Sequence, residues 1–216
     1  ARRQRQMCIR DRFGPRGVEK ESGRLLAGEP RLATADIYAA AVTSDTATVE
    51  RLVADDPSLA AKPGGPRNWP PLLYLCFSQY LRENPERAAS AAATAKVLVE
   101  AGADPSAKFK FDEWGNHGTC LYGAGRVLRN EALAEVLLSA KPEWDIEAYL
   151  YHAPNADDLP ILDAMIAHGM PTERMDYLLR RMMDFENHEA VRWFLDRGAD
   201  PNHRHPTSGT EETSLH

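Results

Sequence analysis

The histidines of this sequence are its first candidates for metal ligands. His188-Glu189 begins like the zinc motif HExxH, but Arg192 stands where the second histidine should be. We therefore expect His188 to lie at a solvent-facing helix start. His203 and His205 could offer two imidazoles, yet no cysteine or carboxylate pattern completes a ligand set. The sequence thus predicts no metal site.

Adjacent carboxylates and closely spaced glycines also lack a catalytic pattern. Asp112-Glu113 and Asp157-Asp158 are neighbours in sequence, whereas a glycosidase needs its acid and base across a cleft. We interpret the two pairs as a polar loop and a helix N-terminus, where negative charge is favourable. Gly123-Ala124-Gly125 lacks the third glycine and preceding strand of a nucleotide-binding loop, so it predicts close helix packing. We expect no cofactor, no catalytic residues and a protein that is not an enzyme.

The three cysteines, Cys8, Cys76 and Cys120, are odd in number and far apart, which argues against a disulfide framework. Cys76 and Cys120 fall on apolar helix faces, and we expect both to be small core residues. With 43% hydrophobic and 27% charged residues, the composition is that of a folded chain.

The net charge and the hydropathy pattern argue against two classes of partner, nucleic acids and membranes. The net charge of -6 argues against a general nucleic-acid binder, which needs a basic face. The sequence has no apolar run of about 18 residues and no charged leader before an apolar stretch, so we expect neither membrane association nor secretion. A cytoplasmic monomer is the expectation.

Residues 1–31 are rich in arginine and have little apolar periodicity, which predicts a poorly structured basic tail. The segment from Arg3 to Arg12 resembles translated adapter sequence and would then have no function. A basic arm for nucleic acid or an anionic membrane is the alternative for this tail.

An internal repeat is the strongest pattern in the sequence. Gly102-Ala103-Asp104-Pro105 recurs as Gly198-Ala199-Asp200-Pro201, an offset of 96 residues that is close to three units of about 33. Apolar residues at i, i+3 and i+4, the buried face of a helix, then recur five times. These stripes are Val49, Leu52, Val53; Ala95, Leu98, Val99; Ala134, Leu137, Leu138; Leu162, Met165, Ile166; and Val191, Phe194, Leu195.

Each of these helices is preceded by a weaker amphipathic segment. The predicted first helices are 37–42, 72–77, 121–128, 146–152 and 175–183. Short polar turns such as Arg129-Asn130 join the members of each pair, so the unit is an antiparallel helix pair. Gly102, Gly169 and Gly198 follow three of the second helices and predict left-handed helix ends. Asp56 and Lys141 occupy that place in the other two.

These residues resemble the ankyrin repeat. Gly198-Ala199-Asp200-Pro201-Asn202 looks like that family's loop, and Thr213-Ser214-Leu215-His216 looks like its Thr-Pro-Leu-His helix opener. Thr119-Cys120-Leu121-Tyr122 and Pro70-Pro71-Leu72-Leu73 occupy the opener's place in two earlier units but lack the histidine. The resemblance implies an all-α fold, an α-solenoid of about five ankyrin-like helix-turn-helix repeats with long connecting loops. It implies an ankyrin-repeat domain over residues 32–216, which we expect to be a fragment ending at the start of a further repeat.

The resemblance also implies a function, a non-enzymatic scaffold that binds a protein partner through its concave face and finger loops. The candidate partner-binding residues lie in two loops that are rich in aromatic and basic side chains: Arg67, Trp69, Phe109, Phe111, Trp114 and His117. These aromatics either contact the partner or pack on neighbouring loops and stiffen them. The rival hypothesis is the interaction portion of an enzyme, with catalytic residues in the irregular loops 109–117 and 203–205 or in a domain beyond residue 216.

Overall fold

A computed structural model of the chain describes residues 28–110, 117–144, 159–170, 173–184 and 186–203. These residues are mostly helical, with one antiparallel pair of short strands, which confirms the expected all-α character. The chain divides into two compact units, Ala1–Ala107 and Lys108–His216, inside the range that the sequence treats as one repeat domain. Over the described residues, no helix combines the length and the apolar character needed to cross a membrane.

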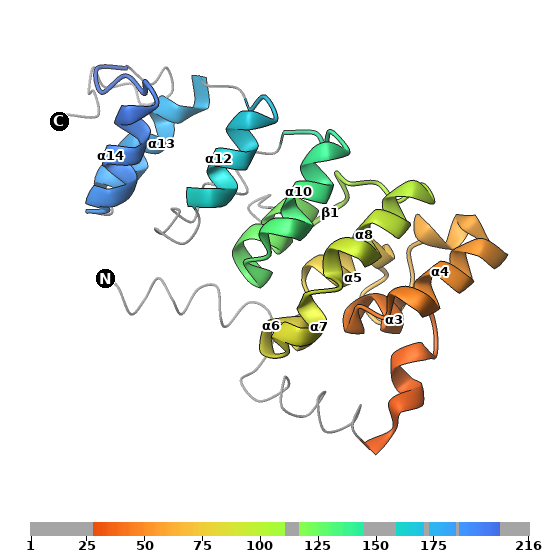
Figure 1. Cartoon of the computed structure of the whole chain (residues 1–216). Coiled ribbons are helices and arrows are strands. Elements are labelled where there is room, and N and C mark those ends of the chain that lie inside the picture. The colour runs from red at the N-terminus through yellow and green to blue at the C-terminus, as the bar shows by residue number, and fades with distance from the viewer. Residues whose placement is uncertain (1–27, 111–116, 145–158, 171–172, 185, 204–216) are drawn as a thin grey trace. The chain divides into compact units, whose positions relative to one another are not determined.

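The first unit is built around four helices. Helix α3 (Ile37–Thr43) packs against α4 (Thr46–Asp55) and α5 (Pro71–Cys76), while α8 (Ala91–Glu100) packs against α4 and α5 (Figure 1). The shorter elements of this unit are η1 (Pro30–Thr34), η2 (Pro57–Ala60), α6 (Gln79–Glu83) and α7 (Pro85–Ala88). Asn84 separates α6 from α7, because Pro85 disfavours helical geometry in the residue before it.

The second unit contains the remaining helices of the described chain. The short helix α9 (Cys120–Tyr122) and the π-helical segment η3 (Gly123–Leu128) pack against α10 (Glu131–Ser139), which contacts α12 (Leu159–Ala167). Helix α13 (Glu173–Asp184) packs against α14 (His188–Asp196). The expected first helix at 146–152 lies outside the described residues.

All five apolar stripes fall on helices, namely α4, α8, α10, α12 and α14. Leu98, Leu137 and Leu162 are completely buried, as is Cys76, and Cys120 is buried too. Leu195 was expected to be buried but is 43% exposed. The buried stripe of α14 is shifted by one residue to Ala190, Trp193 and Phe194, and this helix packs against α13.

Three turns between first and second helices share one geometry. Ser44, Arg129 and Glu186 each adopt a left-handed conformation, with φ of 55°, 53° and 54°. The next residue in each case, Asp45, Asn130 or Asn187, caps the following helix with its side-chain oxygen. The same left-handed residue followed by a capping residue therefore produces the predicted antiparallel pairing in all three turns.

Three of the second helices also end with the same backbone geometry. Gly102, Gly169 and Gly198 have φ of 101°, 91° and 86°, which confirms the predicted left-handed helix ends. Lys141 adopts the same region at φ 54°, whereas Asp56 caps η2 instead. In each glycine-ended copy, the backbone N–H after the glycine donates to the carbonyl five residues earlier, from Ala103 to Leu98, Met170 to Met165 and Ala199 to Phe194.

Two expected elements differ in detail. The segment 121–128 was expected to be one amphipathic helix, but it is π-helical from Gly123, where glycines weaken the preference for a regular α-helix. The loop 109–117 was expected to be irregular, yet its two ends lie in the antiparallel strands β1 (Lys108–Lys110) and β2 (His117–Thr119). Residues 111–116 lie outside the described part.

Candidate functional site

The six candidate partner-binding residues fall in two places. Arg67 and Trp69 lie in the first unit, between η2 and α5. Phe109 and His117 lie in β1 and β2 of the second unit. Phe111 and Trp114 lie outside the described residues. The two loops therefore belong to different units.

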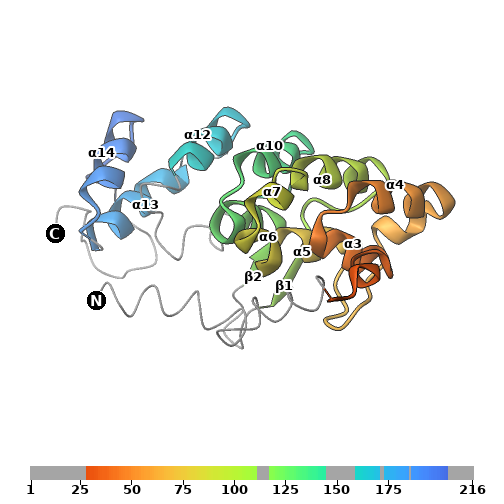
Figure 2. The same cartoon turned by 60° about the horizontal axis from the view of Figure 1, so that its bottom comes forward.

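The loop of residues 62–69, here named the finger loop, forms a tight hairpin. The backbones of Gly64 and Trp69 exchange two hydrogen bonds of 3.1 Å, and the N–H of Asn68 donates to the carbonyl of Gly65 at 3.2 Å. Gly65 and Asn68 have φ of 64° and 52°, a region that glycine and asparagine tolerate best. The backbone conformations of Gly65 and Asn68 thus allow the loop to close. The loop extends away from the helices in Figure 2.

Two tyrosines fasten the finger loop to the helices. The Tyr74 hydroxyl on α5 donates to the carbonyl of Gly64 at 3.0 Å and accepts from the N–H of Arg67 at 2.7 Å. The Tyr38 hydroxyl on α3 donates to the carbonyl of Lys62 at 3.0 Å. A Cβ at Gly64 would overlap the Tyr38 ring, so this position requires glycine for close approach. The loop is therefore held at both of its sides.

The pKa of Tyr38 reflects this environment. Burial raises the pKa of the phenol, and the nearby Asp36 carboxylate and Tyr74 raise it further. All three effects favour the neutral phenol, which is the form that donates to Lys62. The hydrogen bond is consequently retained across the neutral pH range.

Trp69 packs against the body of the first unit. Its ring lies 5.5 Å from that of Tyr74 and 6.0 Å from that of Phe77, measured between centroids. Tyr74 is in turn 5.6 Å from Tyr38. These contacts support the interpretation that Trp69 stiffens the loop. Arg67 is exposed, and its guanidinium carbon sits 4.9 Å from the centroid of the Trp69 ring, a cation–π contact.

The strands of the second unit orient the other candidates. In the antiparallel register, Phe109 faces Gly118 and Lys110 faces His117. Phe109 and His117 are half-buried, while Lys108 and Lys110 are exposed. Thr119 ends β2 and caps α9, its hydroxyl accepting from the N–H of Tyr122 at 3.1 Å. Thr119, the first residue of the opener-like segment, therefore acts as a helix cap.

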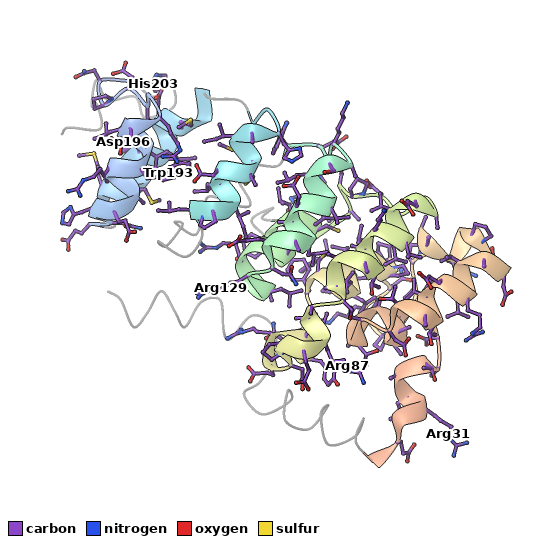
Figure 3. The ribbon with its side chains drawn as sticks, in the orientation of Figure 1. Arg31, Arg87, Arg129, Trp193, Asp196 and His203 are labelled. Atoms are coloured by element: carbon purple, nitrogen blue, oxygen red, sulfur yellow. The ribbon has the colours of Figure 1, made fainter. Side chains whose placement is uncertain are left out.

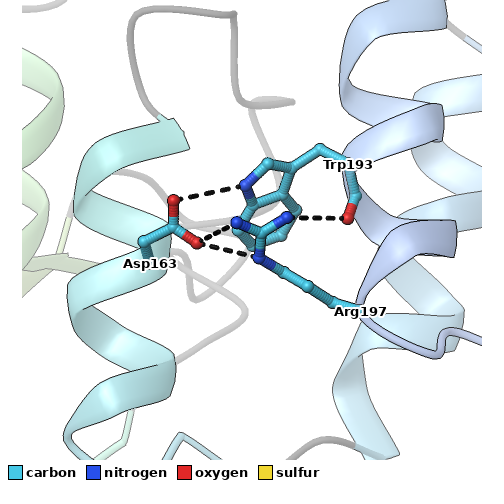
Figure 4. Close-up of polar contacts among 3 residues, drawn as sticks. All are labelled: Asp163, Trp193 and Arg197. Atoms are coloured by element: carbon cyan, nitrogen blue, oxygen red, sulfur yellow. Dashed lines mark hydrogen bonds and ion pairs between the residues drawn. The ribbon is translucent and has the colours of Figure 1, made fainter.

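Polar clusters between helices were not foreseen from the sequence. The Asp163 carboxylate on α12 accepts from the Nε of Arg197 at 2.8 Å and from the Nε1 of Trp193 at 3.4 Å (Figure 4). His168 lies 2.7 Å from Glu135, measured from Nε2 to Oε1. No sequence spacing signals these pairs, because their members are about 30 residues apart and meet only when helices pack.

The candidate histidines have separate environments. His188 is exposed at the start of α14, as expected. His203 lies in the loop that follows α14 (Figure 3), and its Nδ1 is 3.3 Å from the Oδ2 of Asp176. His205 lies outside the described residues. Among the residues that the structure covers, no group of three or more histidine, cysteine or carboxylate side chains is arranged to hold a metal ion.

Each helical unit therefore has a loop that carries both cationic and aromatic side chains. In the first unit this is the loop in which Arg67 stacks over Trp69, and in the second it is the β1–β2 pair. Comparison of the chain with protein-family models gives no match, and neither curated proteins nor solved structures yield one.

Proposed function

We propose that the chain is an ankyrin-like α-solenoid that acts as a non-enzymatic scaffold and binds a protein partner through its concave face and finger loops. Helices occur at nine of the ten expected positions, with the first helix at 146–152 outside the described residues. Stacked helix pairs of this kind bury a continuous core and leave their loops free to bind.

The observation that carries this proposal is the repetition of one loop geometry at an offset of 96 residues. The Asp104 carboxylate accepts from the N–H of Ser106 at 2.8 Å, and the Asp200 carboxylate accepts from the N–H of Asn202 at 2.8 Å. The carbonyl of each aspartate also accepts from the N–H three residues later. Because the same residues make the same bonds twice, they support a true structural repeat.

The loops supply the features of a protein-binding surface. Aromatic residues and arginine are enriched among residues that dominate binding energy at protein interfaces. Phe109 is half-buried between the exposed Lys108 and Lys110 on β1. Phe111 and Trp114 follow in the sequence, so three aromatics stand within six residues. We propose that this segment contacts the partner.

Affinity capture with the purified chain as bait tests the function, followed by measurement of the dissociation constant for each enriched protein. Trp114→Ala should weaken binding by roughly 2 kcal/mol or more while helicity and melting temperature stay nearly unchanged. Tyr80→Ala is the matched control, an aromatic truncation on α6 outside both loops, and should leave affinity unchanged.

Two outcomes would contradict this assignment. If no protein binds the folded chain specifically, the scaffold function is wrong. If Trp114→Ala lowers the melting temperature by several degrees but leaves the affinity per folded molecule unchanged, the aromatic loop is structural and the partner binds elsewhere.

A further inference from the structure

Within the described part of the chain, the Arg67 side chain is positioned by its neighbours and has no acidic partner. Its backbone N–H is bonded to the Tyr74 hydroxyl, and its guanidinium is stacked over Trp69. Over the described residues, the guanidinium N–H groups make no hydrogen bond and no ion pair. Arg197 is also stacked on a tryptophan, but its N–H groups bond to Asp163. Among the described residues, none therefore occupies the guanidinium N–H groups of Arg67.

The finger loop is also a cationic segment of an acidic protein. Residues 57–82 contain Lys62, Arg67 and Arg82 but no aspartate or glutamate, although the whole chain has a net charge of -6. Lys62 is exposed, and its carbonyl is held by the Tyr38 hydroxyl. Two cations, Lys62 and Arg67, therefore flank one hairpin with no carboxylate in the loop to neutralise them.

We propose that Arg67, presented on Trp69, binds a carboxylate side chain in an acidic segment of the partner protein. This inference rests on the proposed scaffold function and names the chemistry of its partner. A guanidinium that stacks through its face keeps its N–H groups in the plane, where they can hold a carboxylate with two parallel hydrogen bonds.

Charge favours an acidic peptide over a nucleic acid at this loop. Nucleic-acid affinity grows with the number of phosphates neutralised, and two cations on a chain of net charge -6 neutralise few. Binding of a single carboxylate needs only one well-placed guanidinium group. The cost of ordering the arginine is already reduced by the stack on Trp69 and by the anchoring of the loop.

Selection of random peptides displayed on phage against the whole chain tests the proposal, followed by fluorescence anisotropy with the selected peptides. We expect them to contain aspartate or glutamate, and binding to weaken as salt is raised. Arg67→Ala should weaken binding roughly 30-fold, the loss typical of an interface anchor. Arg67→Lys keeps the charge but loses the fork and should weaken binding roughly tenfold.

Controls separate this effect from loss of structure. Arg82→Ala removes an exposed arginine of α6 outside the finger loop and should leave affinity within about twofold of the unmodified chain. Melting temperatures of all the variants should stay within a few degrees of the unmodified chain, because the Arg67 side chain is exposed and anchoring of the loop uses its backbone N–H.

The proposal is overturned if no peptide is enriched, if replacing the acidic residue of the peptide by its amide leaves binding unchanged, or if Arg67→Ala binds as tightly as the original. A matched phosphoserine peptide that binds more tightly, through Arg67, would make the ligand a phosphate instead. Capture of a protein partner that binds independently of Arg67 would retain the scaffold function while rejecting this inference.

Discussion

Arg197, the residue that ends α14, and Asp163 on α12 join two helices, although these residues are 34 positions apart in the chain. Both Nε and Nη2 of Arg197 approach Oδ1 of Asp163, at 2.8 and 2.6 Å. The guanidinium carbon lies 4.0 Å from the centroid of the Trp193 ring, and the Trp193 carbonyl accepts from Nη1 at 3.3 Å. One carboxylate thus organises an arginine and a tryptophan across neighbouring helices.

Asp163→Ala should lower the free energy of unfolding by about 1 kcal/mol, because it removes a partly exposed ion pair with Arg197 and the acceptor of the Trp193 indole N–H. Urea denaturation measures this change. Asp196→Ala removes an exposed aspartate from the end of α14 and should change stability by less than about 0.5 kcal/mol. Equal effects of the two substitutions would show that the Asp163 contacts contribute nothing.

Leu98→Ala on α8 and Leu137→Ala on α10 should each cost roughly 2 to 5 kcal/mol, because both side chains are fully buried and truncation leaves a cavity. Denaturant melts of the purified variants give the values. Glu100→Ala, on the exposed face of α8, serves as control. A loss below about 0.5 kcal/mol for both leucines would reject their assignment to the core.

Gly102→Ala and Gly198→Ala should each destabilise the chain by about 1 kcal/mol through backbone strain alone. Both glycines have positive φ, and an added Cβ would meet no atom within 4 Å, so no clash contributes. Lys141→Gly should act in the opposite direction and stabilise by about 0.5 kcal/mol, because Lys141 already has φ of 54°. Thermal melts compare the three. Stabilisation by Gly102→Ala would refute the strain argument.

Stability should fall at alkaline pH because of Tyr38. Its pKa is raised from 10.0 in the folded chain, so the unfolded chain loses this proton first as the pH rises. The contribution of Tyr38 is therefore complete below about pH 10 and is lost as pH rises through the higher folded pKa. Urea unfolding of the wild type and of Tyr38→Phe over this range measures it.

At neutral pH, Tyr38→Phe should be less stable by about 1 kcal/mol, because the hydrogen bond to the carbonyl of Lys62 is lost. The gap between wild type and variant should narrow as the pH rises above 10. Tyr80→Phe controls for the ionisation of other tyrosines. A gap that stays constant with pH would contradict the assignment of the alkaline effect to Tyr38.

The sequence alone determined where the helices lie and how several of them end. Apolar spacing located α4, α8, α10, α12 and α14, and glycine identified three left-handed helix ends. These features are local: they depend on the period of a helix and on the conformations open to one residue. For the same reason the Gly-Ala-Asp-Pro loops could be recognised from sequence and found to share their hydrogen bonds.

Only the tertiary structure decided which faces are covered and which side chains meet. Helix packing leaves Leu195 exposed and buries Trp193, although both residues are apolar and lie on one helix. The hydroxyls of Ser44 and Thr94 lie 3.1 Å apart and are buried between helix pairs, and Tyr38 and Tyr74 anchor the finger loop from two helices. Such contacts join residues that are 10 to 50 positions apart. Their partners depend on how helices pack, which no local periodicity specifies.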